Sequence, residues 1–221
     1  MPKIAVIADS NCGIMPSEEE KYGIYILPMP VIIDGKTYCE GMDISLEEFY
    51  RRQSQGAVIS TSQPSPGDVT AMWDRLLETH DEIVFIPMSS GLSSTCQTSL
   101  LLAAEEPYKG KVFVVDDHRI SVTQAVAALE ARNLAKTGKS AAEIKEILEK
   151  EAMDATIYIA VDTLEYLKKG GRITAAAAAL GTVLRVKPVL TIQGEKLESY
   201  AKARGMKSAF QTMLDALKHD V

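Results

Sequence analysis

Short runs rich in valine and isoleucine alternate with longer helical patterns through residues 1–154 of this chain. Such runs are typical of buried parallel strands, and the helices between them cover both faces of the sheet. Periodicity alone does not separate a buried strand from a buried helix, but the shortness of these runs favours strand. The alternation therefore predicts an α/β fold, with strands at Ile4–Ala8, Ile24–Leu27, Ile83–Ile86 and Val112–Val115.

Capping residues mark where several helices should begin, because the first N–H groups of a helix need outside acceptors. A serine followed by glutamate three residues later fits the capping box. Ser65-Pro66 adds a proline at the first helical position and predicts a helix to about His80. The capping boxes expected are Ser17 with Glu20, Ser45 with Glu48, and Ser140 with Glu143.

Two further features complete the first part of the chain. Asp34-Gly35 lies between strand-like flanks and predicts a hairpin from Val31 to Tyr38, since this dipeptide supplies positive φ in a tight turn. Helices are expected at about Ile120–Lys136 and from Ser140 to about Ala152. The hairpin is an excursion from the alternating pattern.

The pattern of the sequence changes after Thr156. This change predicts a first domain at residues 1–154 and a second, smaller α+β domain at residues 155–221. The Lys168–Arg172 segment reads as a basic glycine turn. The other elements expected are a strand at Ile157–Val161, a helix at Ala175–Leu180, a hairpin pairing Val189–Ile192 with Lys196–Ala203, and a helix at Met206–His219.

Charge and composition narrow the classes of partner. The net charge of −6 and the pI near 5.2 argue against a nucleic-acid surface. No apolar stretch approaches the ~20 residues that a transmembrane segment needs, so the chain is expected to be cytoplasmic. The cysteines and histidines are too scattered for the spacings of metal sites, so no metal is expected and the thiols are interpreted as reduced.

Hydroxyl side chains gather in two segments that precede helices. One is the Ser89–Thr95 run, which follows a strand, and the other is the Ser60–Pro66 run. In open α/β sheets ligands bind at the carboxyl ends of strands, and a helix N-terminus favours an anion. Capping alone would explain one serine in each run, but Thr61 and Ser62 are not needed for the cap at Ser65. The two runs together could hold a carboxylate.

A buried carboxylate must receive charge-assisted hydrogen bonds or be protonated. Arg204 is the candidate cation from the second domain, with an exposed arginine near a helix start as the equal alternative.

Several motifs, in this order, resemble those of the DegV family. They are Asp9-Ser10, TSQPSP from Thr61, SSGLSST from Ser89, LKKGGRI from Leu167, KPVL from Lys187 and KARG from Lys202. Each motif alone is weak, but their order along nearly the whole chain makes the resemblance strong.

The resemblance implies a two-domain, parallel-sheet DegV-like fold with a long-chain fatty acid in a tunnel between the domains. In the kinase-linked FakB members, an ATP-dependent fatty acid kinase subunit converts the bound acid to an acyl phosphate. Carried onto this chain, the head-group ligands are Thr61 and Ser93, with Ser62 and Ser94 beside them. Arg172 would face the kinase, with a plain solvated turn as the alternative. The chain would then be a carrier without a cofactor of its own.

The sequence also departs from the family pattern. Ser94 stands where the family usually has glycine, and Cys96 stands where it has an aromatic residue. Family members continue into a C-terminal segment with a histidine near the head group, whereas this sequence ends at Val221. The second domain is therefore expected to be C-terminally incomplete, with part of the tunnel exposed.

The main alternative is a serine hydrolase that acts on an acyl ester with Ser93 as nucleophile. The Gly91–Thr95 segment nearly matches a nucleophile elbow but lacks its closing glycine. The base would have to be His80, His118 or His219, of which His118 is the best placed because it follows a strand end. An ATP-using activity of the chain itself is disfavoured because it has no GxxxxGK[ST] loop.

Overall fold

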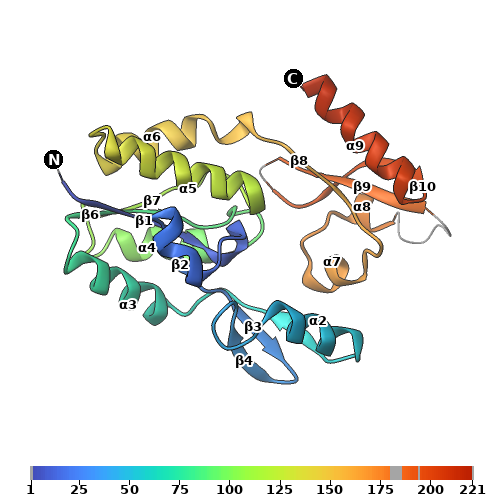
Figure 1. Ribbon diagram of the computed structural model, residues 1–221, viewed down its shortest axis with the longest axis horizontal. Helices are drawn as coiled ribbons and strands as arrows, with labels where there is room; N and C mark the ends of the chain where they lie inside the picture. Colours follow the sequence, from blue (N-terminus) through green and yellow to red (C-terminus); the bar gives the residue numbers. More distant parts are fainter. Residues whose placement is uncertain (1, 180–185, 194, 221) are drawn as a thin grey trace. The chain divides into compact units, whose positions relative to one another are not determined.

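The computed structural model describes residues 2–179, 186–193 and 195–220 (Figure 1). The chain divides into two compact units, residues 1–154 and 155–221. This division falls where the sequence pattern changes, near Thr156.

The first unit is built on a four-stranded parallel sheet in the order β2-β1-β6-β7. This sheet confirms the α/β fold predicted from the alternating runs. Its strands match the four predicted runs to within a residue or two at each end, and they are β1 (Ile4–Asp9), β2 (Tyr25–Leu27), β6 (Glu82–Ile86) and β7 (Val112–Val114).

Both faces of this sheet are buried, because successive residues of each strand point to opposite sides. On one side Val6, Ala8, Val84 and Ile86 pack with α5 (Ser121–Lys136) and α6 (Ala141–Lys150). On the other side Ala5, Ile7, Ile83 and Phe85 pack with α3 (Pro66–Leu77) and α4 (Thr95–Ala103). Figure 1 shows the helices in these two layers. The double burial explains why the strands read as continuous apolar runs.

The helix caps agree with the sequence at three of the four expected positions. Ser65 and Ser140 form reciprocal capping boxes, and Ser45 accepts a hydrogen bond from the Glu48 N–H. α3 ends at Leu77 and not at about His80. The expected box of Ser17 with Glu20 is wrong: a 3-10 turn, Pro16–Glu18, begins earlier and leads into α1 (Glu19–Tyr22).

That earlier start has a local cause. Proline is favoured at the first position of a helix because it has no N–H to satisfy. The Glu18 carboxylate accepts the Met15 N–H at 3.2 Å, so the turn is closed before Ser17 could act as a cap. A further 3-10 turn, Ser10–Cys12, follows β1.

The predicted hairpin belongs to a small antiparallel sheet of order β4-β3-β5. Its strands are β3 (Pro30–Ile33), β4 (Lys36–Cys39) and β5 (Ile59–Thr61), with α2 (Leu46–Ser54) between the last two. Asp34 and Gly35 have φ of 50° and 80°, as the tight turn requires. The sequence pattern does not predict β5, which reads as part of a loop.

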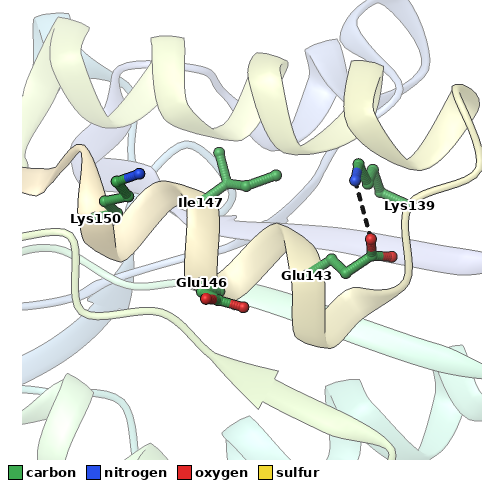
Figure 2. Close-up of a pocket in the computed structure, with 5 residues that line it drawn as sticks. All are labelled: Lys139, Glu143, Glu146, Ile147 and Lys150. Carbon is green, nitrogen blue, oxygen red and sulfur yellow. Dashed lines mark hydrogen bonds and ion pairs between the residues drawn. The ribbon is translucent and has the colours of Figure 1, made fainter.

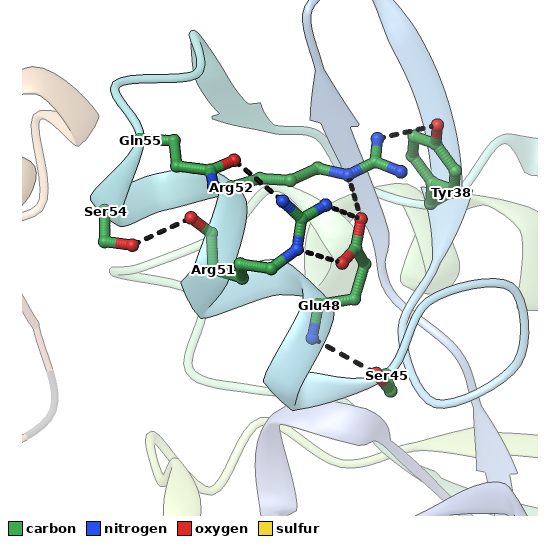
Figure 3. Close-up of polar contacts among 7 residues, drawn as sticks. All are labelled: Tyr38, Ser45, Glu48, Arg51, Arg52, Ser54 and Gln55. Carbon is green, nitrogen blue, oxygen red and sulfur yellow. Dashed lines mark hydrogen bonds and ion pairs between the residues drawn. The ribbon is translucent and has the colours of Figure 1, made fainter.

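Polar contacts fasten α2 to the hairpin (Figure 3). The Glu48 carboxylate accepts hydrogen bonds from Arg51 and Arg52, which lower the pKa of Glu48 to about 2. Arg52 also donates to the Tyr38 hydroxyl at 3.0 Å. The Arg52 guanidinium thereby joins the helix to β4, and the Glu48 carboxylate accepts from the same guanidinium.

The second unit contains an antiparallel sheet of order β10-β9-β8. The hairpin and the last helix lie where they were predicted, although the first strand of the hairpin begins three residues earlier and the second begins two residues later. The elements are β8 (Ile157–Ala160), β9 (Val186–Ile192), β10 (Glu198–Arg204) and α9 (Met206–Asp220). α9 packs on the sheet through Ala209 and Met213. α8 (Ala175–Ala179) lies where a helix is expected. Leu180, at the predicted end of that helix, and Gly194, at the predicted turn of the hairpin, lie outside the described residues.

The prediction of a turn over the whole Lys168–Arg172 segment is wrong. Lys168 and Lys169 belong to a short helix, α7 (Glu165–Gly170), and only Gly171, at φ of 70°, forms the turn that ends it. The sequence suggests a turn for the two lysines because the glycines follow them directly. A glycine in the left-handed region terminates a helix, however, and does not prevent one from forming before it.

Candidate functional site

Three loops meet at the carboxyl edge of the four-stranded sheet. They follow β1 at Asp9, β6 at Ile86 and β7 at Val114. Because the strands are parallel, all three loops emerge at the same edge, the usual place for a ligand in an open α/β sheet. The Ser89–Thr95 run is one of these loops, as the sequence predicted. The candidate site is built from this loop and its neighbours.

Asp9, fully buried at the end of β1, is the anchor of this edge. One carboxylate oxygen accepts the Met88 N–H at 2.7 Å. The other accepts the Asn11 N–H and side-chain amide, both at 3.0 Å, and the Gln124 amide at 3.2 Å. Burial raises the pKa of Asp9, whereas the four donors favour the ionised form. Asp9 therefore fastens the start of the serine loop to β1 and α5.

The serine loop is tied to the loop after β7 as well. The Ser89 N–H donates to the Arg119 carbonyl at 2.8 Å, and the Ser90 N–H donates to Asp116 Oδ1 at 3.3 Å. Within the loop the N–H groups of Leu92 and Ser93 both donate to the Ser89 carbonyl. These bonds give the loop a defined course from β6 to α4.

Ser93 lies at the start of α4, where its hydroxyl accepts the Thr95 N–H at 3.2 Å and bonds the Thr95 hydroxyl at 2.8 Å. Ser94 is exposed and is the N-cap by position, without a side-chain capping bond. The Ser93 hydroxyl thus satisfies one helix N–H, as the capping alternative expected, and it remains half-buried. Its part in holding a ligand stays a prediction.

Thr61 is the last residue of β5, where it pairs with Val31, and both Thr61 and Ser62 are exposed. The connection to the other hydroxyl run goes through the next residue. Gln63 Oε1 accepts a hydrogen bond of 3.2 Å from the Thr98 hydroxyl, on the first turn of α4. The two hydroxyl runs therefore adjoin the same helix.

The two arginines singled out from the sequence lie in the second unit. Arg204 is exposed at the end of β10, opposite Val186. Arg172 follows the glycine that ends α7, and its guanidinium donates to the Gly170 carbonyl at 2.5 Å. The roles expected for both, and the acyl tunnel, stay predictions.

The loop after β7 carries a group of charged residues that the sequence connects only with the base of a hydrolase. Asp117 is fully buried, and burial raises its pKa to about 6. Its Oδ1 accepts the Arg119 N–H at 3.1 Å, whereas its Oδ2 has no hydrogen-bond partner among the described residues. The pair of consecutive aspartates after a predicted strand is the signal that could have placed this loop at the edge of the site.

The hydrolase alternative requires a base beside Ser93. Within the described part of the chain, the partner of the Ser93 hydroxyl is Thr95, and no histidine is hydrogen-bonded to it. His80 lies after α3, where Nδ1 contacts the Leu76 carbonyl at 3.1 Å. His118 is the histidine at the carboxyl edge of the sheet.

The thiols are free and those of Cys12 and Cys96 are buried. Burial raises the pKa of Cys12 to about 11 and that of Cys96 to about 12, which leaves both as weak nucleophiles. Among residues 2–179, 186–193 and 195–220, no three side chains of the metal-binding types gather in one place, and no helix could cross a membrane.

A hollow of about 240 Å³ lies elsewhere, on the surface of α6 (Figure 2). Charged side chains line it, and Lys139 and Glu143 form an ion pair of 2.9 Å beside it. Its lining contains none of the residues of the candidate site.

Known proteins share this sequence pattern along nearly the whole chain. The family model described as "Uncharacterised protein, DegV family" matches residues 3–221. A DegV domain-containing protein of Caldanaerobacter subterraneus is 32% identical over 219 residues, which cover 99% of this chain and 78% of the relative.

Solved structures of DegV proteins are also similar to this chain along nearly its whole length. A fatty-acid-binding DegV family protein from Thermus thermophilus matches with a TM-score of 0.88 and 33% identity, over 99% of this chain and 78% of that one. DegV of Bacillus subtilis, described as a fatty acid binding protein, matches with a TM-score of 0.86 and 28% identity, over 100% of this chain and 78% of that one.

Proposed function

This chain belongs to the DegV family, and we propose that it binds a long-chain fatty acid at the carboxyl edge of its parallel sheet. The observation that carries the proposal is the start of α4, where the hydroxyl-rich loop from Ser89 to Thr95 lies at that edge. The two solved relatives named above, both described as fatty-acid-binding, support it.

The physical requirements of such a ligand fit these residues. A carboxylate needs donors that replace its water, and hydroxyls together with the open N–H groups of a helix start supply them. Each buried methylene contributes about 0.8 kcal/mol, so a long acyl chain gains on the order of 10 kcal/mol before the costs of binding. The chain would supply affinity, and the head-group contacts would fix position.

In the finer proposal, Thr61 and Ser93 are the head-group ligands, with Ser62 and Ser94 as neighbouring donors and Arg204 as the cation. The protein then presents the carboxyl group to a separate ATP-dependent kinase, which forms the acyl phosphate. In this scheme the chain is a carrier without a cofactor, located in the cytoplasm, and Arg172 faces the kinase. Positioning of the carboxyl oxygen is its contribution to the chemistry.

The site is tested by removing the two hydroxyls one at a time. Thr61→Ala and Ser93→Ala are each expected to weaken fatty acid binding about tenfold, which corresponds to one lost hydrogen bond to a charged group. Mass spectrometry of the lipid extracted from the purified protein, followed by titration with the acid found, gives the measurement.

Thr70→Ala is the matched control, because Thr70 is a hydroxyl of α3 that bonds carbonyls of its own helix. Binding equal to that of the unaltered protein in both site variants would show that the head group lies elsewhere. An activated ester that is turned over, and no longer turned over after Ser93→Ala, would favour the serine hydrolase instead.

The kinase contact is tested separately. Arg172→Glu reverses a charge on the second unit and is expected to leave acid binding unchanged while phosphorylation by a fatty acid kinase with ATP falls about tenfold or more, as for a rim charge that guides the encounter. Lys196→Glu makes the same charge change at an exposed residue for which no partner role is proposed. Equal loss in both variants would mean that net charge, and not Arg172, governs the encounter.

A further inference from the structure

His118 occupies a strained position beside the serine loop. It follows β7 at the carboxyl edge, and its φ is 56°, in the left-handed region. Ser121, three residues later, has φ of 58°. This conformation is uncommon for a residue with a side chain, and such strain persists only where the surroundings impose it.

The surroundings that impose it are the hydrogen bonds of the next residue, Arg119. The Arg119 carbonyl accepts the Ser89 N–H, the Arg119 N–H donates to Asp117, and the Arg119 guanidinium donates to the Glu151 carbonyl at 2.5 Å. His118 is therefore held between two residues that are fixed on both sides. Its neighbour Arg119 accepts the N–H of Ser89, and the Ser89 carbonyl in turn accepts the N–H of Ser93, so the backbone of His118 is connected to that of Ser93 by hydrogen bonds.

The imidazole has a buried nitrogen close to an acid. Among the described residues His118 Nδ1 has no hydrogen-bond partner, and it lies 3.6 Å from Asp116 Oδ1, the same oxygen that accepts the Ser90 N–H. The side chain is 37% exposed, and because Nδ1 is its buried nitrogen, Nε2 belongs to the accessible part of the ring. With Nδ1 buried near a carboxylate, Nε2 is the ring nitrogen that a ligand can reach.

We propose that His118, with Asp116 near its buried Nδ1, is a further ligand of the head group and donates from Nε2 as an imidazolium to the acid's carboxylate. The inference rests on the proposed fatty acid binding and adds to it a cation from the first unit, beside the one that the finer proposal assigns to Arg204. Histidine is the side chain that changes charge between about pH 5 and 8, so binding of the acid becomes dependent on pH in this range.

Charged groups face His118 from two elements. On its own loop these are the acids Asp116 and Asp117 and the base Arg119, whose guanidinium is directed to the Glu151 carbonyl. From α6, Glu149 accepts the Asp116 N–H and is paired with Lys145, so that pair adds little net charge. Because the imidazolium, and not the neutral ring, carries the charge that attracts a carboxylate, acid binding is expected to be stronger at the lower pH.

The test is the affinity for oleate, measured by displacement of a fluorescent fatty acid at pH values from about 5.5 to 8, across the range in which histidine titrates. The unaltered protein is expected to bind about tenfold more weakly at the upper end, as for the loss of one charged hydrogen bond. His118→Asn, which tolerates the left-handed conformation but carries no charge, is expected to bind weakly with a flat profile. Asp117→Asn removes the other group of this loop that titrates in the range. A binding profile that still depends on pH in this variant assigns the dependence to His118, and a profile that becomes flat assigns it to Asp117 and overturns the inference.

A second variant separates binding from strain. His118→Gly is expected to raise the thermal midpoint, since glycine adopts this φ freely, while oleate binding falls as in His118→Asn. Parallel pH profiles for the unaltered protein and His118→Asn would overturn the inference and leave the proposed function standing. Failure of oleate to bind at any pH would remove the proposed function, and this inference with it.

Discussion

Asp9→Asn is expected to lower the free energy of unfolding by about 2–4 kcal/mol, because the variant leaves buried donors without acceptors. Asp9 accepts four hydrogen bonds through its two oxygens. An asparagine offers one acceptor oxygen. In either orientation of the amide, its NH2 group would face an N–H of Met88 or of Asn11, so no rotation restores the contacts.

Chemical denaturation of both proteins at one pH measures the loss. Asp81→Asn is the matched control, since Asp81 is exposed and accepts a hydrogen bond from the Lys3 N–H at 2.7 Å. That substitution should cost well under about 1 kcal/mol, as expected for the surface. Similar losses in the two variants would mean that the four bonds of Asp9 do not fix the start of the serine loop.

Asp117→Asn is expected to change the free energy of unfolding by an amount that depends on pH and that favours the variant at higher pH. Burial raises the pKa of Asp117 from 3.8 to about 6, so the folded protein holds the proton more tightly than the unfolded chain does. The resulting stability is complete below the unfolded pKa and is lost as the pH rises through the folded one. A shift of this size corresponds to about 3 kcal/mol.

The measurement is the difference in unfolding free energy between Asp117→Asn and the unaltered protein, followed from about pH 4 to about pH 8. The difference should move in favour of the variant by about 2–3 kcal/mol over this range, because only the unaltered protein must bury a charge as the pH rises. The amide placed where Oδ2 has no partner adds a constant offset and does not change the slope. A difference independent of pH would show that Asp117 is already charged in the folded protein at low pH.

The parallel sheet was predictable because its information is local. The Ile83–Ile86 run carries its own strand signal, and the capping box at Ser140 marks a helix without reference to any distant residue. β5 could not be found in this way, since Ile59–Thr61 is a strand only because β3 pairs with it. The three residues have no pattern of their own that distinguishes them from the loop that follows.

The candidate site shows the same division. The position of the serine loop followed from a strand and a helix that the sequence reveals, and Ser93 directly precedes the cap of that helix. Its role as a ligand stays a prediction. The anchoring role of Asp9 could not be predicted, because its partners Met88 and Gln124 lie 79 and 115 residues away in the chain. The backbone strain at His118 was equally hidden, since most histidines lie outside the left-handed region.

The small antiparallel sheet has a consequence for how the family's surface can vary. The chain enters it at β3 and leaves it at β5, and Val31 is the direct partner of Thr61 across these neighbouring strands. The segment between these two strands, which contains β4 and α2, therefore begins and ends at neighbouring positions of the sheet. Segments of different length or sequence could be grafted between Asp34 and Val58 while the backbone still delivers Thr61 to the same point.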